Sequence, residues 1–224
     1  MQGLAELRES ARPWVIAHRG YSRRFPENTI AAFAAAVDAG ADMIELDVRL
    51  SSDGVPVVIH DDTVDRTTAG GGPVVAHTVA ELKRLGVPSL EEVFQRIRIP
   101  INIELKRGAP TDDVVALVRR LGVEDQCLLS SFDLRLLAPL DLPVAALFER
   151  SLDDAVGECR ACGAIAGSPN VAFLQAGEVS RLNEAGLRVL PYTVNDAATM
   201  RMVIEWGAGG MFTDEPQLLR EVLA

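Results

Sequence analysis

The chain lacks the features that would indicate a disulfide scaffold, a membrane protein or a nucleic-acid-binding protein. Its 224 residues include only three cysteines, an odd number without framework spacing, which favours a reducing and therefore cytoplasmic environment. No segment approaches the roughly 20 uninterrupted apolar residues of a membrane span. The net charge is -10, whereas nucleic-acid binding would require basic patches. We therefore expect neither stable membrane insertion nor a nucleic-acid partner.

Two short segments could be taken for a secretory signal and a zinc site, but each lacks a feature that such a segment needs. Met1–Arg12 mixes acidic and basic side chains and has no apolar core, so we expect no secretory signal there. Cys159 and Cys162 form a single Cys-x-x-Cys, with no second pair to complete a tetrahedral zinc site. We expect both thiols to be buried packing residues of a helix.

Short β-branched runs alternate with amphipathic helical stretches along the whole chain, which is typical of a parallel α/β fold. No linker or internal repeat is evident, and the glycine-rich Ala69–Pro73 indicates a loop, so we predict one domain over residues 1–224. The predicted strands are Val15–Ala17, Met43–Leu50, Val55–Ile59, Ile101–Leu105, Leu128–Ser131, Val144–Phe148, Ala164–Ala166, Arg188–Thr193 and Gly210–Thr213. The predicted helices are Asn28–Ala39, Leu90–Ile97, Thr111–Leu121, Leu152–Cys162, Gln175–Ala185, Ala197–Trp206 and Gln217–Leu223.

The residues at the predicted helix ends support several of these boundaries. Asn28 and Thr111 can accept the first unpaired backbone amides as N-caps. Gly40, Gly186 and Gly207 lie where helices should stop, because a glycine adopts the left-handed conformation that ends a helix.

One of the nine predicted strands cannot be parallel to the strand before it. Parallel neighbours need a crossover of a dozen or more residues, whereas Ser51–Gly54 is a tight turn. The segment 55–59 should therefore fold back antiparallel on 43–50. A turn centred on Ser52 and Asp53 pairs Leu50 with Val55, Asp47 with Val58 and Glu45 with His60. Without this extra arm eight parallel strands remain, the number that closes a (β/α)₈ TIM barrel.

Ionisable side chains gather at the predicted ends of the early strands, where the active sites of such barrels lie. His18 and Arg19 follow the first strand, and His60 ends the arm. Residues two apart on a strand point the same way, so Glu45 and Asp47 share a face. The inward-facing residues of the next parallel strand are Asn102, Glu104 and Lys106.

Three inward carboxylates at neighbouring strand ends need a positive partner. At about 4 Å and an effective dielectric constant near 20, each like-charge pair costs roughly 4 kcal/mol. Glu45, Asp47 and Glu104 should therefore either have a raised pKa or hold a divalent cation such as magnesium, manganese or calcium. Arg19 and Lys106 can offset part of this charge, and both side chains also suit a phosphate.

The residues also match the motifs of a known family. The motifs are Ala17-His18-Arg19-Gly20, Pro26-Glu27-Asn28-Thr29, Glu45-Leu46-Asp47, Asp53-Gly54, His60-Asp61, Asp65-Arg66-Thr67-Thr68, Asn102-Ile103-Glu104-Leu105-Lys106, Ser131-Phe132, Thr193-Val194-Asn195 and Thr213-Asp214-Glu215-Pro216. In this order they resemble the glycerophosphodiester phosphodiesterase family from residue 17 to residue 216.

The resemblance implies a TIM barrel of the PLC-like phosphodiesterase type that hydrolyses glycerophosphodiesters to glycerol 3-phosphate and an alcohol, in glycerol and lipid metabolism. It implies one divalent cation, magnesium or calcium, on Glu45, Asp47 and Glu104. It also implies His18 and His60 as the acid–base pair and Arg19 and Lys106 as phosphate ligands. We take His18 as base and His60 as acid, although the residues leave the order open. They also leave open whether water attacks directly or a cyclic phosphate forms first.

Two departures from the family pattern concern the substrate's alcohol group. The stretch Asp61–Val93 contains no Phe, Tyr or Trp, although the family usually has a longer and aromatic excursion there. Tyr192, a further candidate for substrate and phosphate binding, stands where the family usually has tryptophan. We therefore expect a more open pocket. We interpret Pro26–Thr29 and Arg66–Thr68 as structural.

Three other functions compete with this prediction. An open pocket also suits a lysophospholipid phosphodiesterase acting through the same site. A barrel without activity that binds phosphoesters is less consistent with the chain, because every ionisable catalytic position is filled. A barrel isomerase or aldolase would bind phosphate at the last strands, whereas here the charge lies on the early ones. The sequence makes no prediction of oligomeric state.

Overall fold

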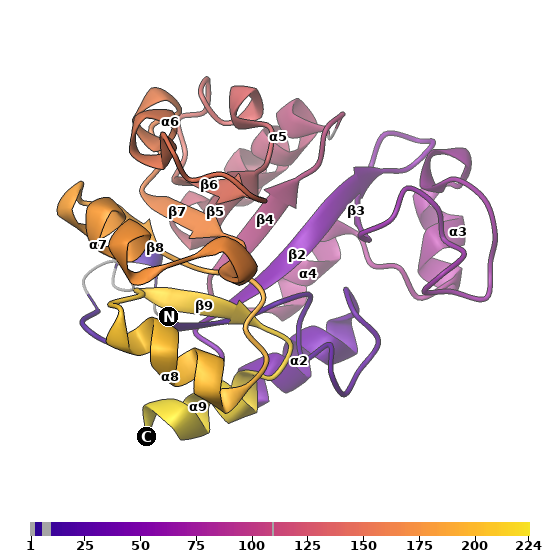
Figure 1. Cartoon of the computed structure of the whole chain (residues 1–224). Coiled ribbons are helices and arrows are strands. Elements are labelled where there is room, and N and C mark those ends of the chain that lie inside the picture. Colours follow the sequence, from indigo (N-terminus) through magenta and orange to yellow (C-terminus); the bar gives the residue numbers. More distant parts are fainter. Residues whose placement is uncertain (1–2, 6–9, 109) are drawn as a thin grey trace.

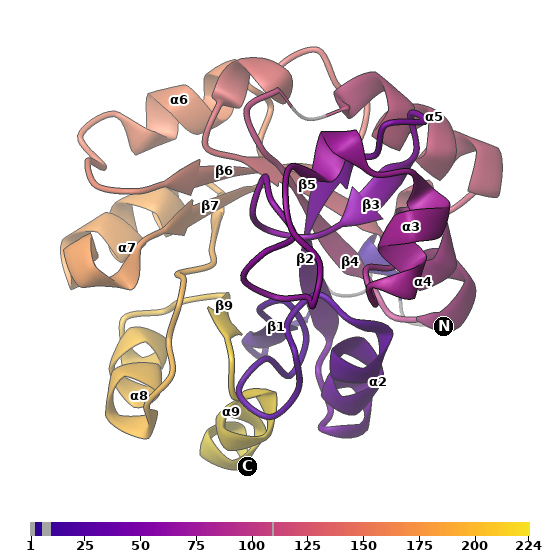
Figure 2. The ribbon, with the colours of Figure 1, turned by 90° about the vertical axis from the view of Figure 1, so that its right-hand side faces the viewer.

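The computed structural model describes residues 3–5, 10–108 and 110–224, and in them eight parallel strands form a barrel surrounded by helices (Figures 1 and 2). The charged stretch Met1–Arg12 lies partly outside the described residues. The strands are β1 (Trp14–Ala17), β2 (Met43–Leu50), β3 (Pro56–Val58), β4 (Ile101–Leu105), β5 (Cys127–Ser131), β6 (Val144–Phe148), β7 (Ala166–Pro169), β8 (Arg188–Val189) and β9 (Gly210–Thr213). The α-helices are α2 (Ile30–Asp38), α3 (Val79–Arg84), α4 (Leu90–Arg96), α5 (Thr111–Leu121), α6 (Ala155–Ala161), α7 (Ala176–Glu184), α8 (Ala197–Glu205) and α9 (Pro216–Leu223).

The parallel ladder runs in the order β8-β7-β6-β5-β4-β2-β1-β9, and β3 pairs with β2 outside this path. Individual backbone hydrogen bonds join the two ends of the ladder. The amide of Gly209 donates to the carbonyl of Val189 at 2.9 Å, and Phe212 donates to Pro191 at 2.9 Å. The amide of Val194 donates in turn to the carbonyl of Phe212 at 2.8 Å. The predicted TIM barrel is therefore confirmed.

Alternating residues of each strand supply two separate apolar layers. Ile16 and Met43 belong to the cluster that fills the barrel interior, whereas Val15 and Ile44 belong to the cluster that packs against the surrounding helices. This alternation follows from the period of two along a strand. Because apolar residues fill the lower interior, the polar positions further along the same strands are left at the barrel mouth.

The strand β3 forms the predicted antiparallel arm, which projects from the barrel together with α3 (Figure 1). The predicted register of this arm is wrong by one residue, because Leu50 pairs with Pro56 and Val48 with Val58. The amide of Ser51 donates to the carbonyl of Val55 at 3.1 Å, so the turn itself holds residues 52–54, three rather than two, and its last residue, Gly54, has the left-handed φ of 77°. A three-residue hairpin loop favours glycine at this position.

Two predicted helix caps are also wrong. The side chain that accepts from the first turn of α2 is Thr29, since Asn28 adopts a φ of 58° and points elsewhere. The residue preceding α5 is Pro110, so Thr111 already lies inside that helix. The glycines after α2, α7 and α8 do have positive φ angles, as predicted. The helix α3 was not predicted; its N-cap is Thr78, which forms a capping box with Glu81.

The later strands differ from their predicted limits. The strand β7 begins where its predicted segment ended, and β8 is only two residues long, with an isolated bridge from Asn170 to Tyr192 further on. Small residues such as Ala164 and Ala166 carry little strand signal, so the periodicity did not locate β7. Cys159 and Cys162 are free and buried, as expected.

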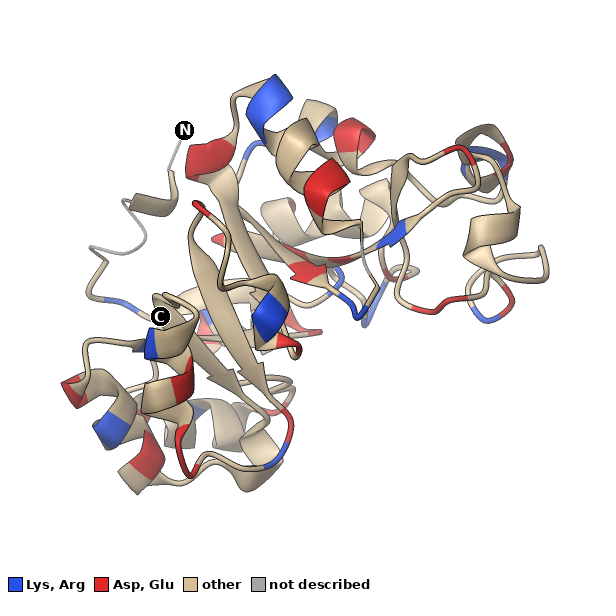
Figure 3. Cartoon of the chain, turned by 90° about the horizontal axis from the view of Figure 1, so that it is seen from above, with Lys and Arg blue, Asp and Glu red and all other residues tan. Residues whose placement is uncertain are grey.

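The exterior carries charges of both signs on its helices and loops (Figure 3). Of the helices described, none combines the length and the apolar character needed to cross a membrane.

A substitution at Gly210 tests the close packing of β9 against β1. A Cβ on Gly210 would lie 2.8 Å from Cβ of Trp14 and 2.9 Å from its backbone nitrogen. We expect Gly210→Ala to lower the free energy of unfolding by about 1–3 kcal/mol, because overpacked sites cannot relax fully. Chemical denaturation measures the change. Gly177→Ala is the control, since nothing lies within 4 Å of its Cβ; equal midpoints for both variants would contradict the close packing of β9 against β1.

Candidate active site

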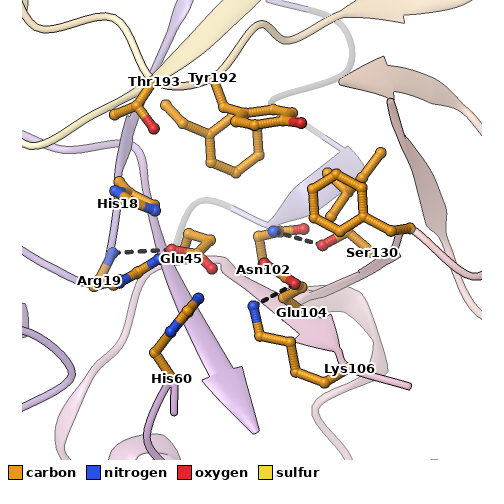
Figure 4. Close-up of a pocket in the computed structure, with 13 residues that line it drawn as sticks. His18, Arg19, Glu45, His60, Asn102, Glu104, Lys106, Ser130, Tyr192 and Thr193 are labelled. Atoms are coloured by element: carbon orange, nitrogen blue, oxygen red, sulfur yellow. Dashed lines mark hydrogen bonds and ion pairs between the residues drawn. The ribbon is translucent and has the colours of Figure 1, made fainter. Parts of the chain in front are cut away.

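A cavity of about 230 Å³ opens at the carboxyl ends of the barrel strands (Figure 4). One part of its wall is charged and the other is largely apolar. The charged residues are His18, Arg19, Glu45, His60, Glu104 and Lys106, and the others are Asn102, Ser130, Phe132, Leu147, Tyr192, Thr193 and Phe212. Asp47 lies directly beneath, fully buried. The structure thus brings all eight predicted site residues together.

Three carboxylates from two adjacent strands converge at this cavity. Glu45, Asp47 and Glu104 each offer an oxygen, and these oxygens lie within 4.8 Å of one another. The register places Asp47 of β2 directly beside Glu104 of β4. Burial, together with the charge of Asp47, raises the pKa of Glu45 to about 8. Burial and Asp47 likewise raise the pKa of Glu104.

Two basic side chains neutralise part of this charge, and both contact Asp47. Nζ of Lys106 lies 2.7 Å from Oδ1 of Asp47 and 2.5 Å from Oε1 of Glu104. Nε of Arg19 lies 3.4 Å from Oδ2 of Asp47. Burial by itself would raise the pKa of Asp47, but Lys106 and Arg19 outweigh it and hold this pKa at about 2. Asp47 is therefore the ionised member of the cluster.

The cluster fits a divalent cation on its donor chemistry. Three carboxylates face two basic groups, so when all three are ionised one negative charge has no cationic partner. The residue with that excess is Glu45, whose Oε2 accepts only a backbone hydrogen bond from the amide of Arg19, at 2.9 Å, among the contacts of the described residues. Oxygen ligands with surplus negative charge are the set that magnesium and calcium prefer.

The imidazole of His18 is oriented by a carboxylate on the last strand. Its Nδ1 lies 2.7 Å from Oδ1 of Asp214, which also accepts from the hydroxyl of Ser22 at 2.9 Å. Burial raises the pKa of Asp214, but the hydrogen bonds outweigh it and the net pKa is lowered. An ionised carboxylate only accepts, so Nδ1 carries the proton and Nε2 is the nitrogen left for chemistry.

Burial also lowers the pKa of His18, but the hydrogen bond to Asp214 and the charge of Glu45 outweigh it. The net pKa of His18 therefore lies above its usual value.

The second imidazole is held in the same way. Nδ1 of His60 lies 2.7 Å from Oδ1 of Asp61, and a guanidinium from Arg66 holds the pKa of that carboxyl well below its usual range. Nδ1 of His60 is therefore also the donor, which leaves Nε2 for proton transfer. Both histidines line the cavity (Figure 4), His18 from the end of β1 and His60 from the loop that follows β3.

The sequence analysis gave no role to three polar residues that hold the site. Asp61 and Asp214 orient the histidines. Asp214 directly follows β9 and Asp61 lies three residues after the end of β3, and these positions near strand ends were the available signal. Asn28 donates from Nδ2 to Oδ2 of Asp47 at 2.9 Å. The left-handed backbone of Asn28 directs this side-chain amide toward the three carboxylates. The only sequence signal for that conformation was that asparagine tolerates a positive φ.

The remaining wall is apolar and comes from the later strands. The rings of Phe132 and Tyr192 meet edge to face at 5.8 Å, and Leu147 and Phe212 line the cavity beside them. The hydroxyl of Tyr192 donates to the carbonyl of Phe148 at 3.0 Å. Tyr192 therefore presents its ring to the cavity rather than its hydroxyl.

The closed barrel, with acids and histidines at its mouth, belongs to the class of (β/α)₈ barrel enzymes, and comparisons with known proteins define it further. The model of the glycerophosphoryl diester phosphodiesterase family matches residues 18–218. A glycerophosphodiester phosphodiesterase of Caldanaerobacter subterraneus is 35% identical, over 92% of this chain and 95% of its own. One of Bacillus subtilis is 31% identical, over 92% and 85%.

Among solved structures, a phosphodiesterase of Oleispira antarctica in complex with the product sn-glycerol-3-phosphate superposes with a TM-score of 0.88. The two sequences are 28% identical, over 96% of this chain and 98% of the other. The chain belongs to the glycerophosphoryl diester phosphodiesterase family and is a phosphodiesterase.

The pKa of Glu45 leads to a prediction about metal binding. A carboxyl with a pKa of about 8 is mostly protonated at pH 7, and a cation binds only the ionised form. We expect calcium binding at pH 7 to release about one proton, and far less at pH 9. Calorimetry in buffers of different ionisation enthalpy measures this number. The Glu45→Gln variant should release fewer protons than the wild type; equal release by both proteins would refute the assignment.

Proposed function

We propose that the enzyme hydrolyses glycerophosphodiesters to glycerol 3-phosphate and an alcohol, with one divalent cation on Glu45, Asp47 and Glu104. The observation that carries this proposal is the convergence of two carboxylate-oriented imidazoles on one cluster of three acids. The product complex of the Oleispira antarctica phosphodiesterase supports the same reaction.

The phosphate of the substrate would lie in the cavity, whose wall carries both the acid cluster and the two basic side chains. A bound divalent cation supplies Lewis-acid stabilisation of the charge that grows on the phosphate oxygens. Arg19 and Lys106, both in the cavity wall, hold the other phosphate oxygens. Lys106 contacts both Asp47 and Glu104, so its ammonium group is already held in place. Substrate binding therefore does not have to pay the entropy of ordering this side chain.

The two histidines carry the proton transfers through Nε2. One imidazole accepts the proton of the nucleophile, and the other, protonated, donates to the leaving alkoxide. We predicted His18 as base and His60 as acid. The raised pKa of His18 weighs toward the reverse order, because a base must be neutral before it reacts.

A second substrate class, the lysophospholipids, is favoured by one observation. Phe132 is 46% exposed at the rim and continues the apolar wall outward from the cavity, where an acyl chain would pack. Parallel assays with glycerophosphocholine and lysophosphatidylcholine separate the two substrates.

The free, buried cysteines support our proposal that the enzyme acts in the cytoplasm.

Removal of either catalytic imidazole tests the mechanism. We expect His18→Ala and His60→Ala each to lower kcat on glycerophosphocholine by about 10²–10⁴-fold, since each removes one general acid or base. Circular dichroism should show an unchanged fold. His77→Ala is the matched control, because His77 lies outside the cavity and, among the described residues, its imidazole bonds only the carbonyl of Gly71. Near-normal turnover by either variant would exclude that histidine.

Removal of the cation tests the cofactor. We expect excess chelator to abolish hydrolysis and added magnesium or calcium to restore it, because the acid cluster would lose the charge that offsets Glu45. Initial rates with each metal in turn measure the preference. Full activity in excess chelator would remove the cation from the proposal.

A further inference from the structure

All three side-chain nitrogens of one partly exposed arginine, Arg66, donate hydrogen bonds to carboxylates beside the cavity. Arg66 lies on the loop between β3 and α3 and forks onto two carboxylates at once. Its Nε and Nη2 donate to Oδ2 and Oδ1 of Asp61, at 2.6 and 3.1 Å. Its Nη1 and Nη2 donate to Oε2 and Oε1 of Glu27, at 2.9 and 2.8 Å.

Each of these carboxylates shares one oxygen with a residue of the active site. Oδ1 of Asp61 is also the partner of Nδ1 of His60, at 2.7 Å. Oε1 of Glu27 also accepts from Nη1 of Arg19, at 3.0 Å. The single Nη2 group of Arg66 therefore lies between the oxygen that holds His60 and the oxygen that holds Arg19.

The contacts also join two parts of the fold. Glu27 lies in the loop between β1 and α2, whereas Asp61 and Arg66 lie in the loop between β3 and α3, within the projecting arm (Figure 1). Among the ion pairs of the described residues, those of Arg66 with Glu27 are the ones that reach from the arm to the β1–α2 loop. The arm carries His60 into the cavity wall, so the bonds from Arg66 to Glu27 hold the arm against the barrel close to His60.

An ordinary exposed ion pair contributes little, because both side chains lose entropy and water screens them. Here the Arg66 side chain is 48% exposed, but its partners are less so, at 19% for Glu27 and 27% for Asp61. Burial raises the pKa of Glu27, but the bonds from Arg66 and Arg19 outweigh it and the net pKa is lowered. Both carboxylates therefore stay ionised and act only as acceptors.

We propose that Arg66 is a positioning residue that sets the orientations of His60 and Arg19 together, through Asp61 and Glu27. This goes beyond the structural role that the motif alone indicated. It also deepens the proposed function, on which its kinetic consequences rest. Arg66 itself does not line the cavity, so its effect passes through the two carboxylates.

The kinetic test uses Arg66→Met with a matched control. We expect a fall of about 10–100-fold in kcat/KM on glycerophosphocholine, the usual cost of removing a residue that orients a ligating or catalytic group. Arg66→Lys should not restore activity, because an ammonium cannot fork onto two carboxylates. Arg120→Met removes a bidentate pair with Glu91 on the exterior, at 3.1 and 3.2 Å, and should stay within about twofold.

The two branches should separate in the kinetic constants. Asp61→Asn should lower mainly kcat through His60, and Glu27→Gln should raise mainly KM through Arg19. Adding Arg66→Met to either variant should cost less than the product of the single effects, because coupled residues are not additive. Full additivity, or kcat and KM within twofold of the wild type for Arg66→Met, would overturn the proposal.

A third readout does not depend on turnover. In ¹⁵N NMR spectra of labelled histidine at alkaline pH, His60 should be a single Nδ1–H tautomer in the wild type and a mixture in Arg66→Met. An unchanged tautomer in the variant would show that Arg66 does not position His60. If the wild type fails to hydrolyse glycerophosphodiesters while the tautomer still responds, the proposed substrate fails and the positioning role stands.

Discussion

The buried charge of Asp47 is the constraint on which the site depends. A carboxylate without solvent must be paired, and this one is paired three times, by Lys106, Arg19 and Asn28. Those partners come from β4, from the end of β1 and from the loop before α2, so one charge holds together three segments at the barrel mouth. Both basic side chains contact Asp47 and neither contacts Glu45 among the ion pairs of the described residues, so the cluster keeps a carboxylate that could bind a metal.

The charged and the apolar residues of the site lie on different strands of the barrel. The early strands and β9 carry the acids, bases and histidines, whereas β5 to β8 supply Phe132, Leu147 and Tyr192. A phosphodiester has the same two-part character, a charged phosphorus centre and organic groups on either side. The projecting arm adds His60 to the charged half but contributes no aromatic cover, which leaves the apolar half with an exposed rim at Phe132. The exposed apolar rim therefore lies on other strands than the charged groups.

Much of the fold and of the candidate site was predictable because it rests on local periodicity and on order along the chain. Eight strands after removal of the arm, and the alternation of Asn102, Glu104 and Lys106, follow from the period of two. The predicted register of the hairpin was wrong because the length of its loop depends on the conformation of Gly54. The sequence of this turn is compatible with a two-residue and with a three-residue loop. The limits of β7 and β8 failed because small residues and proline carry little strand preference.

The sequence by itself determined the barrel, the family motifs and the types of side chain at the strand ends. Only the tertiary structure decided which groups meet: that Asn28 turns away from its helix to Asp47, that Asp214, 196 residues along the chain, holds His18, and that Arg66 joins Glu27 to Asp61. The physical reason is that hydrogen bonds and ion pairs depend on distances of about 3 Å between segments far apart in the chain. Such distances arise from strand closure, loop conformation and arm position, and no local pattern encodes them.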